Sequence, residues 1–122
     1  MKVSRIILFA LLSSCVIDQL YKIAIVKNDA SYDISVIYTT QSEISDEELF
    51  YMGTQSVPAK AEIVVNGNST GEGLYFFFFN EDSVYKYIKS GQKQGIVKQS
   101  FLKKVFHAYD DASKIDTIIY KP

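Results

Sequence analysis

Residues 74–79 form an unbroken apolar run, Leu-Tyr-Phe-Phe-Phe-Phe, which constrains the fold more than any other segment of the chain. Successive side chains of a strand point to opposite faces of its sheet. A continuous run of large apolar residues therefore predicts a strand buried on both faces, or one with a face covered by another element. The turn-rich residues 66–73 precede the run. We expect residues 74–79 to be the core strand of the domain.

Five further segments have the composition of strands. Their apolar and β-branched residues alternate with polar ones, which is the period of a half-buried strand. Residues 28–31 are a short polar link between the first two segments, so a hairpin is expected there. In the segment 100–109, we expect Phe101, Val105 and His107 on the face opposite Leu102, Lys104 and Phe106. The five predicted strands are 21–27, 32–38, 61–65, 100–109 and 115–120.

One helix is predicted over residues 80–91. Asn80 is a suitable N-cap residue, and Gly91 is placed for the left-handed residue that ends many helices. Acidic residues open the segment and lysines close it, in agreement with the helix dipole. Val84, Tyr87 and Ile88 form a stripe with helical spacing that we expect to face the sheet.

The order of these elements favours a mainly β fold. We expect an antiparallel β-sandwich, immunoglobulin-like, with one short late helix. The alternative is an α+β sheet with the helix packed on one face. The acidic residues 39–48 predict an exposed loop, with one helical turn starting at Ser45, and residues 49–52 a short strand or a cover over the core. The length suits a single small domain.

The first fifteen residues have the pattern of an export signal. Lys2 and Arg5 precede the apolar residues 6–12, and Leu-Ser-Ser-Cys closes the segment at Cys15. This pattern resembles a bacterial lipoprotein signal peptide, in which the cysteine is acylated and becomes the new N-terminus. The apolar run is much shorter than the ~20 residues that span a bilayer as a helix.

The resemblance implies a signal peptide at residues 1–14, a lipidated tether at 15–20 and one β-rich domain at 21–122. Acyl chains on Cys15, palmitate among them, then hold the protein in a membrane, since two or more chains give a durable anchor. Lipidation also accounts for the single cysteine of an exported chain. The residue after the cysteine is Val16 and not aspartate, which favours the outer membrane. Both its periplasmic face and its surface face are compatible with the sequence.

The C-terminal part of the chain carries a second resemblance. An aromatic strand runs into the helix that begins Asn80-Glu81-Asp82-Ser83, and a last strand ends at Tyr120 and Pro122. The chain resembles small uncharacterised lipoproteins of gut Bacteroidota over about its last fifty residues and the Leu-Ser-Ser-Cys segment. It departs from them at Asp116, where tryptophan is expected. The resemblance implies a β-rich envelope domain and no catalytic residues.

Two short segments match the site at which Bacteroidota O-glycosylate exported proteins. The pattern is aspartate, then serine or threonine, then an apolar residue, and it places a glycan on Ser83 or Thr117. Glycosylation requires an accessible hydroxyl. The alternative roles are a first-turn helix residue for Ser83 and an ordinary strand residue for Thr117.

The sequence offers few residues for catalysis or metal binding. His107 is the single histidine, and Asp110 and Asp111 are close enough in sequence to orient it. A strand position at the surface explains it more simply. One histidine and one cysteine do not make a four-ligand zinc site. The acidic residues 43–48 and 110–111 lack the spacing of an EF-hand, so solvated loops are expected in place of calcium sites. We expect no catalytic residues, no metal and no cofactor.

These observations favour a non-catalytic, lipid-anchored envelope protein that acts as an accessory or interaction module. Its partners are expected to be the membrane, through the lipid, and an envelope protein or glycan. Nucleic acid is not expected, because the mature chain has a net charge of about −3, from 11 basic and 14 acidic residues once Lys2 and Arg5 are removed. The alternative is a glycan-binding module of polysaccharide uptake, with tyrosines that stack on sugars, and a small hydrolase ranks third. The tyrosines considered are Tyr32, Tyr38, Tyr51 and Tyr109.

Overall fold

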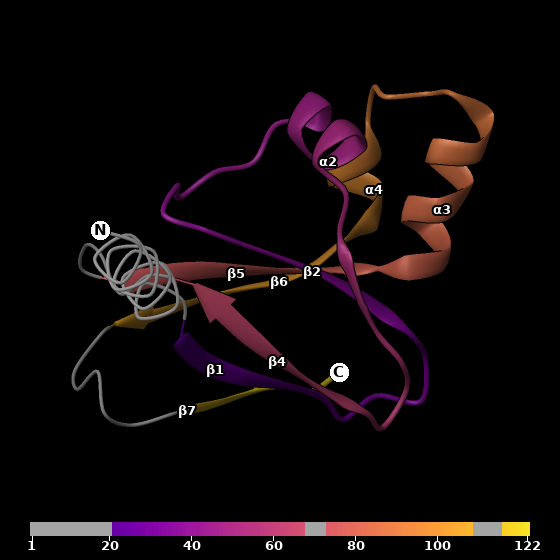
Figure 1. Cartoon of the computed structure of the whole chain (residues 1–122). Coiled ribbons are helices and arrows are strands. Elements are labelled where there is room, and N and C mark those ends of the chain that lie inside the picture. The colour runs from indigo at the N-terminus through magenta and orange to yellow at the C-terminus, as the bar shows by residue number, and fades with distance from the viewer. Residues whose placement is uncertain (1–20, 68–72, 109–115) are drawn as a thin grey trace, which may run out of the picture.

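The computed structural model describes residues 21–67, 73–108 and 116–122. Figure 1 shows three layers, with helices on one side of β2, β5 and β6 and the strands β1, β4 and β7 on the other. The elements are β1 (Tyr21–Asn28), β2 (Ile34–Thr39), α2 (Asp46–Met52), β3 (Gln55–Val57), β4 (Glu62–Gly67), β5 (Gly73–Asn80), α3 (Glu81–Ser90), α4 (Ile96–Ser100), β6 (Phe101–Ala108) and β7 (Asp116–Tyr120).

The strands form two sheets. One has the order β4-β1-β7 and the other β3-β2-β5-β6. All pairs in the larger sheet are antiparallel, as is β1 with β4, whereas β1 and β7 run parallel. The mainly β, two-sheet sandwich with a short late helix is confirmed. The parallel pair and helix α4 were not predicted, and helix α2 is longer than the single turn expected at Ser45.

A hydrophobic core fills the space between the two sheets. Phe76 and Phe78 of β5 are fully buried there, beside Val26 of β1 and Ile118 of β7. The ring of Phe78 lies 5.5 Å from the ring of Tyr120, between centroids. This core uses one face of the predicted central strand.

A second hydrophobic core lies between the larger sheet and the helices. Phe77 and Phe79 of β5 are buried there with Leu49 of α2, Val84 of α3 and Ile96 of α4. Both faces of β5 are therefore covered, as the apolar run 74–79 predicts. The two architectures considered from the sequence are combined in the fold, since a second sheet covers one face of the larger sheet and helices cover the other.

The predicted hairpin between residues 21–27 and 32–38 is wrong. β1 and β2 belong to different sheets. The side chain of Asn28, fully buried, donates from Nδ2 to the carbonyl oxygens of Tyr32 and Val57, and its Oδ1 accepts from the Ala30 N–H at 2.9 Å. These bonds satisfy the backbone where the chain crosses from one sheet to the other, so the link is a corner between layers.

The helix after β5 is confirmed, with both of its predicted ends. Asn80 Oδ1 accepts from the Ser83 N–H at 3.0 Å, and Gly91 adopts φ 75°, a left-handed conformation. Of the predicted stripe, Val84 is buried and Tyr87 half-buried, but Ile88 is 42% exposed. Fewer residues of the stripe are therefore buried than the helical spacing predicts.

Residues 46–52 form helix α2, where the sequence predicted only a turn and then a strand or cover. Ser45 and Glu48 make a capping box at its start. Leu49 is fully buried, so the segment does cover the core, but in helical form.

A partly buried pair of hydroxyl groups joins the segment before β2 to the end of β7. The Tyr32 and Tyr120 hydroxyl oxygens lie 2.7 Å apart. Burial, together with the hydrogen bond to Tyr32, raises the pKa of Tyr120 to about 12. The neutral phenol is therefore the form that the folded protein favours.

We expect the free energy of unfolding to fall as the pH rises from about 10 to about 12. In this range the unfolded chain releases the Tyr120 proton while the folded protein retains it. Urea denaturation across this range measures the effect, with Tyr120→Phe as the control because phenylalanine has no proton to release. An equally steep fall in the variant would contradict the assignment to Tyr120.

Candidate functional site

The predicted modification sites differ in what the structure shows of them. Cys15 lies outside the described residues. The Ser83 hydroxyl is half-buried in the first turn of α3, 2.8 Å from the hydroxyl of the fully buried Ser100. Thr117 is exposed on β7. A glycan on Thr117 therefore has room, while one on Ser83 requires the bond to Ser100 to break.

His107 lies near the end of β6 and contacts an acid other than the two predicted. Its Nε2 is 3.4 Å from Asp116 Oδ2, at the start of β7, while Asp110 and Asp111 lie outside the described residues. Among the described residues, no hydrogen bond joins His107 to a hydroxyl. The pair connects β6 of one sheet to β7 of the other.

The three described tyrosines of the four considered for sugar stacking do not form a common platform. Tyr32 and Tyr38 are half-buried beside the core between the sheets. Tyr51 is 67% exposed on α2, with the Lys93 ammonium 5.2 Å from its ring centroid. Tyr109 lies outside the described residues. None of the three described rings stacks on another of them.

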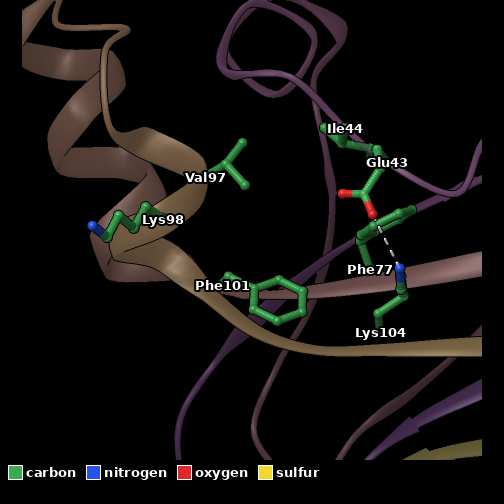
Figure 2. A pocket seen from close by; sticks show the side chains of 7 residues that line it. All are labelled: Glu43, Ile44, Phe77, Val97, Lys98, Phe101 and Lys104. Carbon is green, nitrogen blue, oxygen red and sulfur yellow. Dashed lines mark hydrogen bonds and ion pairs between the residues drawn. The ribbon is translucent and has the colours of Figure 1, made fainter.

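A cavity of about 270 Å³ opens on the helix side of the larger sheet. Phe77 of β5 and Phe101 of β6 contribute its aromatic walls. Figure 2 shows the side chains of the α4 region on one side and those of the loop before α2 on the other. The lining residues are Glu43, Ile44, Phe77, Val97, Lys98, Phe101 and Lys104.

A register shift in β6 gives the cavity one of its walls. Between Phe78 and Phe79 the pairing with β6 shifts, so Phe78 is opposite Lys103 but Phe79 is opposite Phe101. The extra residue places Phe101 on the helix side, with its ring 6.2 Å from that of Phe79. The predicted face shared by Phe101 and Val105 is therefore wrong, because Val105 packs against the core between the sheets.

Lys104 is a charged residue in the lining of this cavity. Its Nζ donates to the Ser42 carbonyl at 3.0 Å and lies 3.5 Å from Glu43 Oε1, the ion pair drawn in Figure 2. The same ammonium is 5.7 Å from the ring centroid of Tyr75 and 5.9 Å from that of Phe77. The Lys104 ammonium therefore contacts two aromatic rings of the sheet and also holds the loop at residues 42–43 over them.

The aromatic surface continues along β6 beyond the cavity. The ring of Phe106 lies 4.7 Å from that of Tyr75, and Phe106 is 48% exposed. Phe101 is 44% exposed at the other end of the strand. We call the surface made by Tyr75, Phe77, Phe101, Lys104 and Phe106, together with the cavity, the β6 face. Exposed aromatic rings beside an apolar cavity are characteristic of binding sites.

Asp46 holds the wall of the cavity that comes from α4. Its carboxylate, on the first residue of α2, accepts from the Gly95 N–H at 2.9 Å and the Val97 N–H at 3.0 Å. These two bonds lower the pKa of Asp46 below its ordinary value of 3.8. The ionised carboxylate therefore fixes the start of α4, and with it the position of Val97.

Replacement of Asp46 by asparagine is expected to loosen α4, because the amide has one acceptor oxygen in place of two. Hydrogen exchange at the Gly95 and Val97 amides should become at least tenfold faster. For the native protein, the contribution of Asp46 to stability is present above pH 3.8 and is lost as the pH falls below it. Unchanged exchange in the variant would contradict this role, and Glu47→Gln, one residue later on α2, is the matched control.

Sequence reasoning missed the β6 face, although one signal was available. Residues 83–108 contain six lysines and no aspartate or glutamate, while the chain as a whole is slightly acidic. Charge segregation of this kind is informative about partners. The lysines belong to α3, to the loop after it, to α4 and to β6: Lys86, Lys89, Lys93, Lys98, Lys103 and Lys104.

Three of the four acidic residues at positions 43–48 have structural partners. Glu43 pairs with Lys104, Glu48 closes the capping box, and Asp46 binds the start of α4. Within residues 21–67, 73–108 and 116–122, no three His, Cys, Asp or Glu side chains gather where they would hold a metal ion. No helix in the same ranges has the length and apolar character needed to cross a membrane.

Comparisons with protein families, curated proteins and solved structures find no match to this chain.

Proposed function

We propose that this protein is a non-catalytic, lipid-anchored module of the cell envelope that binds a partner through the β6 face. The observation that carries the proposal is the joining of exposed rings, Phe101 and Phe106, to an apolar cavity of about 270 Å³ with Lys104 beside it. Large exposed apolar groups cost solubility, so a small domain that keeps several together favours a binding role.

The anchor proposed at Cys15 restricts where the β6 face can act. Residues 15–20 form the proposed tether, and six extended residues reach about 20 Å. The domain therefore stays close to the leaflet that holds the acyl chains, which we propose to be the outer membrane. A partner within this distance is bound at a high effective concentration.

Site-specific photocrosslinking in intact cells tests the proposal. A crosslinking residue at Phe106 is expected to give a discrete adduct, and the same residue at Val64 is expected to give none. Val64 is the matched control because it is 42% exposed on β4, in the opposite sheet. The Phe106 adduct should disappear when Phe101→Ala is added. Equal labelling at both positions, or none at Phe106, would contradict binding at the β6 face.

The second candidate is a glycan-binding module of a polysaccharide-uptake system. The observation that favours it is the exposed ring of Phe106, which is tilted by 54° against the ring of Tyr75 and is an aromatic surface on which a sugar ring can stack. Neutral oligosaccharides on an array separate the two candidates. Binding that is lost in Phe106→Ala supports the glycan role, and an empty array together with the crosslinked protein adduct supports the first candidate.

A further inference from the structure

β6 is the edge strand of the larger sheet in the described structure. The order β3-β2-β5-β6 leaves β6 with one neighbour, β5, along its whole length. In an antiparallel edge strand, every second residue directs its N–H and C=O away from the sheet. These groups are available for hydrogen bonds to an added strand.

The other edges are shorter than β6. β3, at the opposite edge of the same sheet, has three residues and is followed by Pro58, while β4 and β7 have six and five. Short edges and proline are common protections against unwanted strand pairing. β6 has eight residues and no proline. Among the described edges, it is the one that offers the longest template for a further strand.

The charge of β6 indicates which strand fits. Lys103 and Lys104 are adjacent and exposed, and residues 83–108 contain no acidic side chain. Antiparallel pairing of β6 with a second copy would place lysines near lysines, which is unfavourable. Lys104 already has Glu43 at 3.5 Å, but Lys103 has no ion pair among the described residues. An acidic strand complements this edge, and a second copy of the chain does not.

The cavity adds a site for one side chain of the same strand. Phe101 and Lys104 belong to β6 and also line the cavity, so a strand beside β6 passes the opening. Side chains of a strand alternate between faces. Lys103 lies opposite Phe78 and so on the face away from the cavity, whereas Lys104 lies opposite Phe77 on the cavity face. A single extended segment can therefore direct an apolar side chain into the cavity and acidic ones toward Lys103.

We propose, as a deepening of the partner-binding role above on which it rests, that β6 receives an extended acidic segment of a partner protein as a fifth strand. Backbone hydrogen bonds to β6 supply the pairing. Acidic side chains on one face of the added strand meet Lys103, and an apolar side chain on its other face enters the cavity beside Phe101 and Lys104. Binding of this kind selects a partner by charge and by its ability to form a strand.

The probe is a fluorescent eight-residue peptide that alternates glutamate and valine, added to the full chain in non-ionic detergent. Two matched peptides accompany it, one with lysine in place of glutamate and one acidic peptide with a central proline. We expect saturable binding of the first by fluorescence anisotropy and at least tenfold weaker binding of the other two. The proline peptide keeps the charge but cannot pair fully, so equal binding of both acidic peptides would overturn strand addition.

Hydrogen exchange locates the peptide. Strand addition predicts slower exchange at alternate amides of β6, those that point away from β5, with β4 unchanged. An acidic oligosaccharide is the further probe. If it binds as well as the peptide and leaves β6 exchange unchanged, the lysine surface is a polyanion site and the proposal is overturned.

Charge reversal provides the variant test. Lys103→Glu is expected to weaken binding of the acidic peptide at least tenfold and to strengthen binding of the lysine peptide. Lys86→Glu makes the same change on the exposed surface of α3 and should alter binding less than twofold. Equal losses in both variants would mean a general field effect and overturn the proposal. If none of the peptides binds while the crosslink from Phe106 is still formed, strand addition is wrong and the partner-binding role stands.

Discussion

Replacement of Phe78 by alanine is expected to destabilise the protein by about 3–5 kcal/mol, the range typical of a large aromatic residue removed from a well-packed core. Phe78 is fully buried, opposite Val36 on β2 and close to the ring of Tyr120. Its removal leaves a cavity between the two sheets that rigid strands cannot fill. A loss of this size approaches the whole stability of a small domain.

Urea denaturation of Phe78→Ala against the native chain measures this loss. The matched control is Phe106→Ala, the same chemical change at a side chain that is 48% exposed on β6. It should cost less than about 1 kcal/mol, because little apolar surface returns to water. Similar losses in the two variants would contradict the assignment of Phe78 to a sealed core between sheets.

Replacement of Cys15 by serine is expected to abolish acylation of the protein. The proposed lipid attachment requires a cysteine sulfur, and Cys15 is the single cysteine of the chain. Labelling with radioactive palmitate should mark the native protein and leave Cys15→Ser unmarked. Mass spectrometry should find residues 1–14 removed from the native protein and retained in the variant.

Ser14→Ala is the control for this experiment, since it keeps a small residue before the cysteine and should be acylated normally. The decisive contrary result is a native protein with a free thiol at Cys15 and an intact Met1. In that case the envelope placement fails, whereas the β6 face and its peptide-binding test remain.

Much of the fold was predictable because the relevant interactions are local. Asn80 and Gly91 bound α3 through hydrogen bonds within a few residues of each end, so the sequence alone identifies that helix. The run 74–79 predicts a doubly covered strand, since its side chains alternate over both faces of the sheet whatever surrounds them. The sandwich class follows from the number and length of the strands.

The candidate site was not predictable in the same way. Phe101 faces the cavity because the pairing of β6 with β5 shifts at Phe79, and Lys104 lies there because a loop about sixty residues earlier supplies Ser42 and Glu43. Asp46 positions α4 from a helix that is 49 residues away in sequence from Gly95. Strand periodicity carries no information on such contacts.

The sequence by itself determined the central aromatic strand, the helix after it and the absence of acidic residues from the lysine-rich segment 83–108. Each of these depends on residues that are neighbours along the chain. Only the tertiary structure decided that β1 and β2 separate into two sheets at Asn28, that helices form a third layer, and that β6 is left at an edge beside a cavity. The physical reason is that sheet order, register and the partners of buried polar groups depend on the packing of distant segments, which local patterns do not encode.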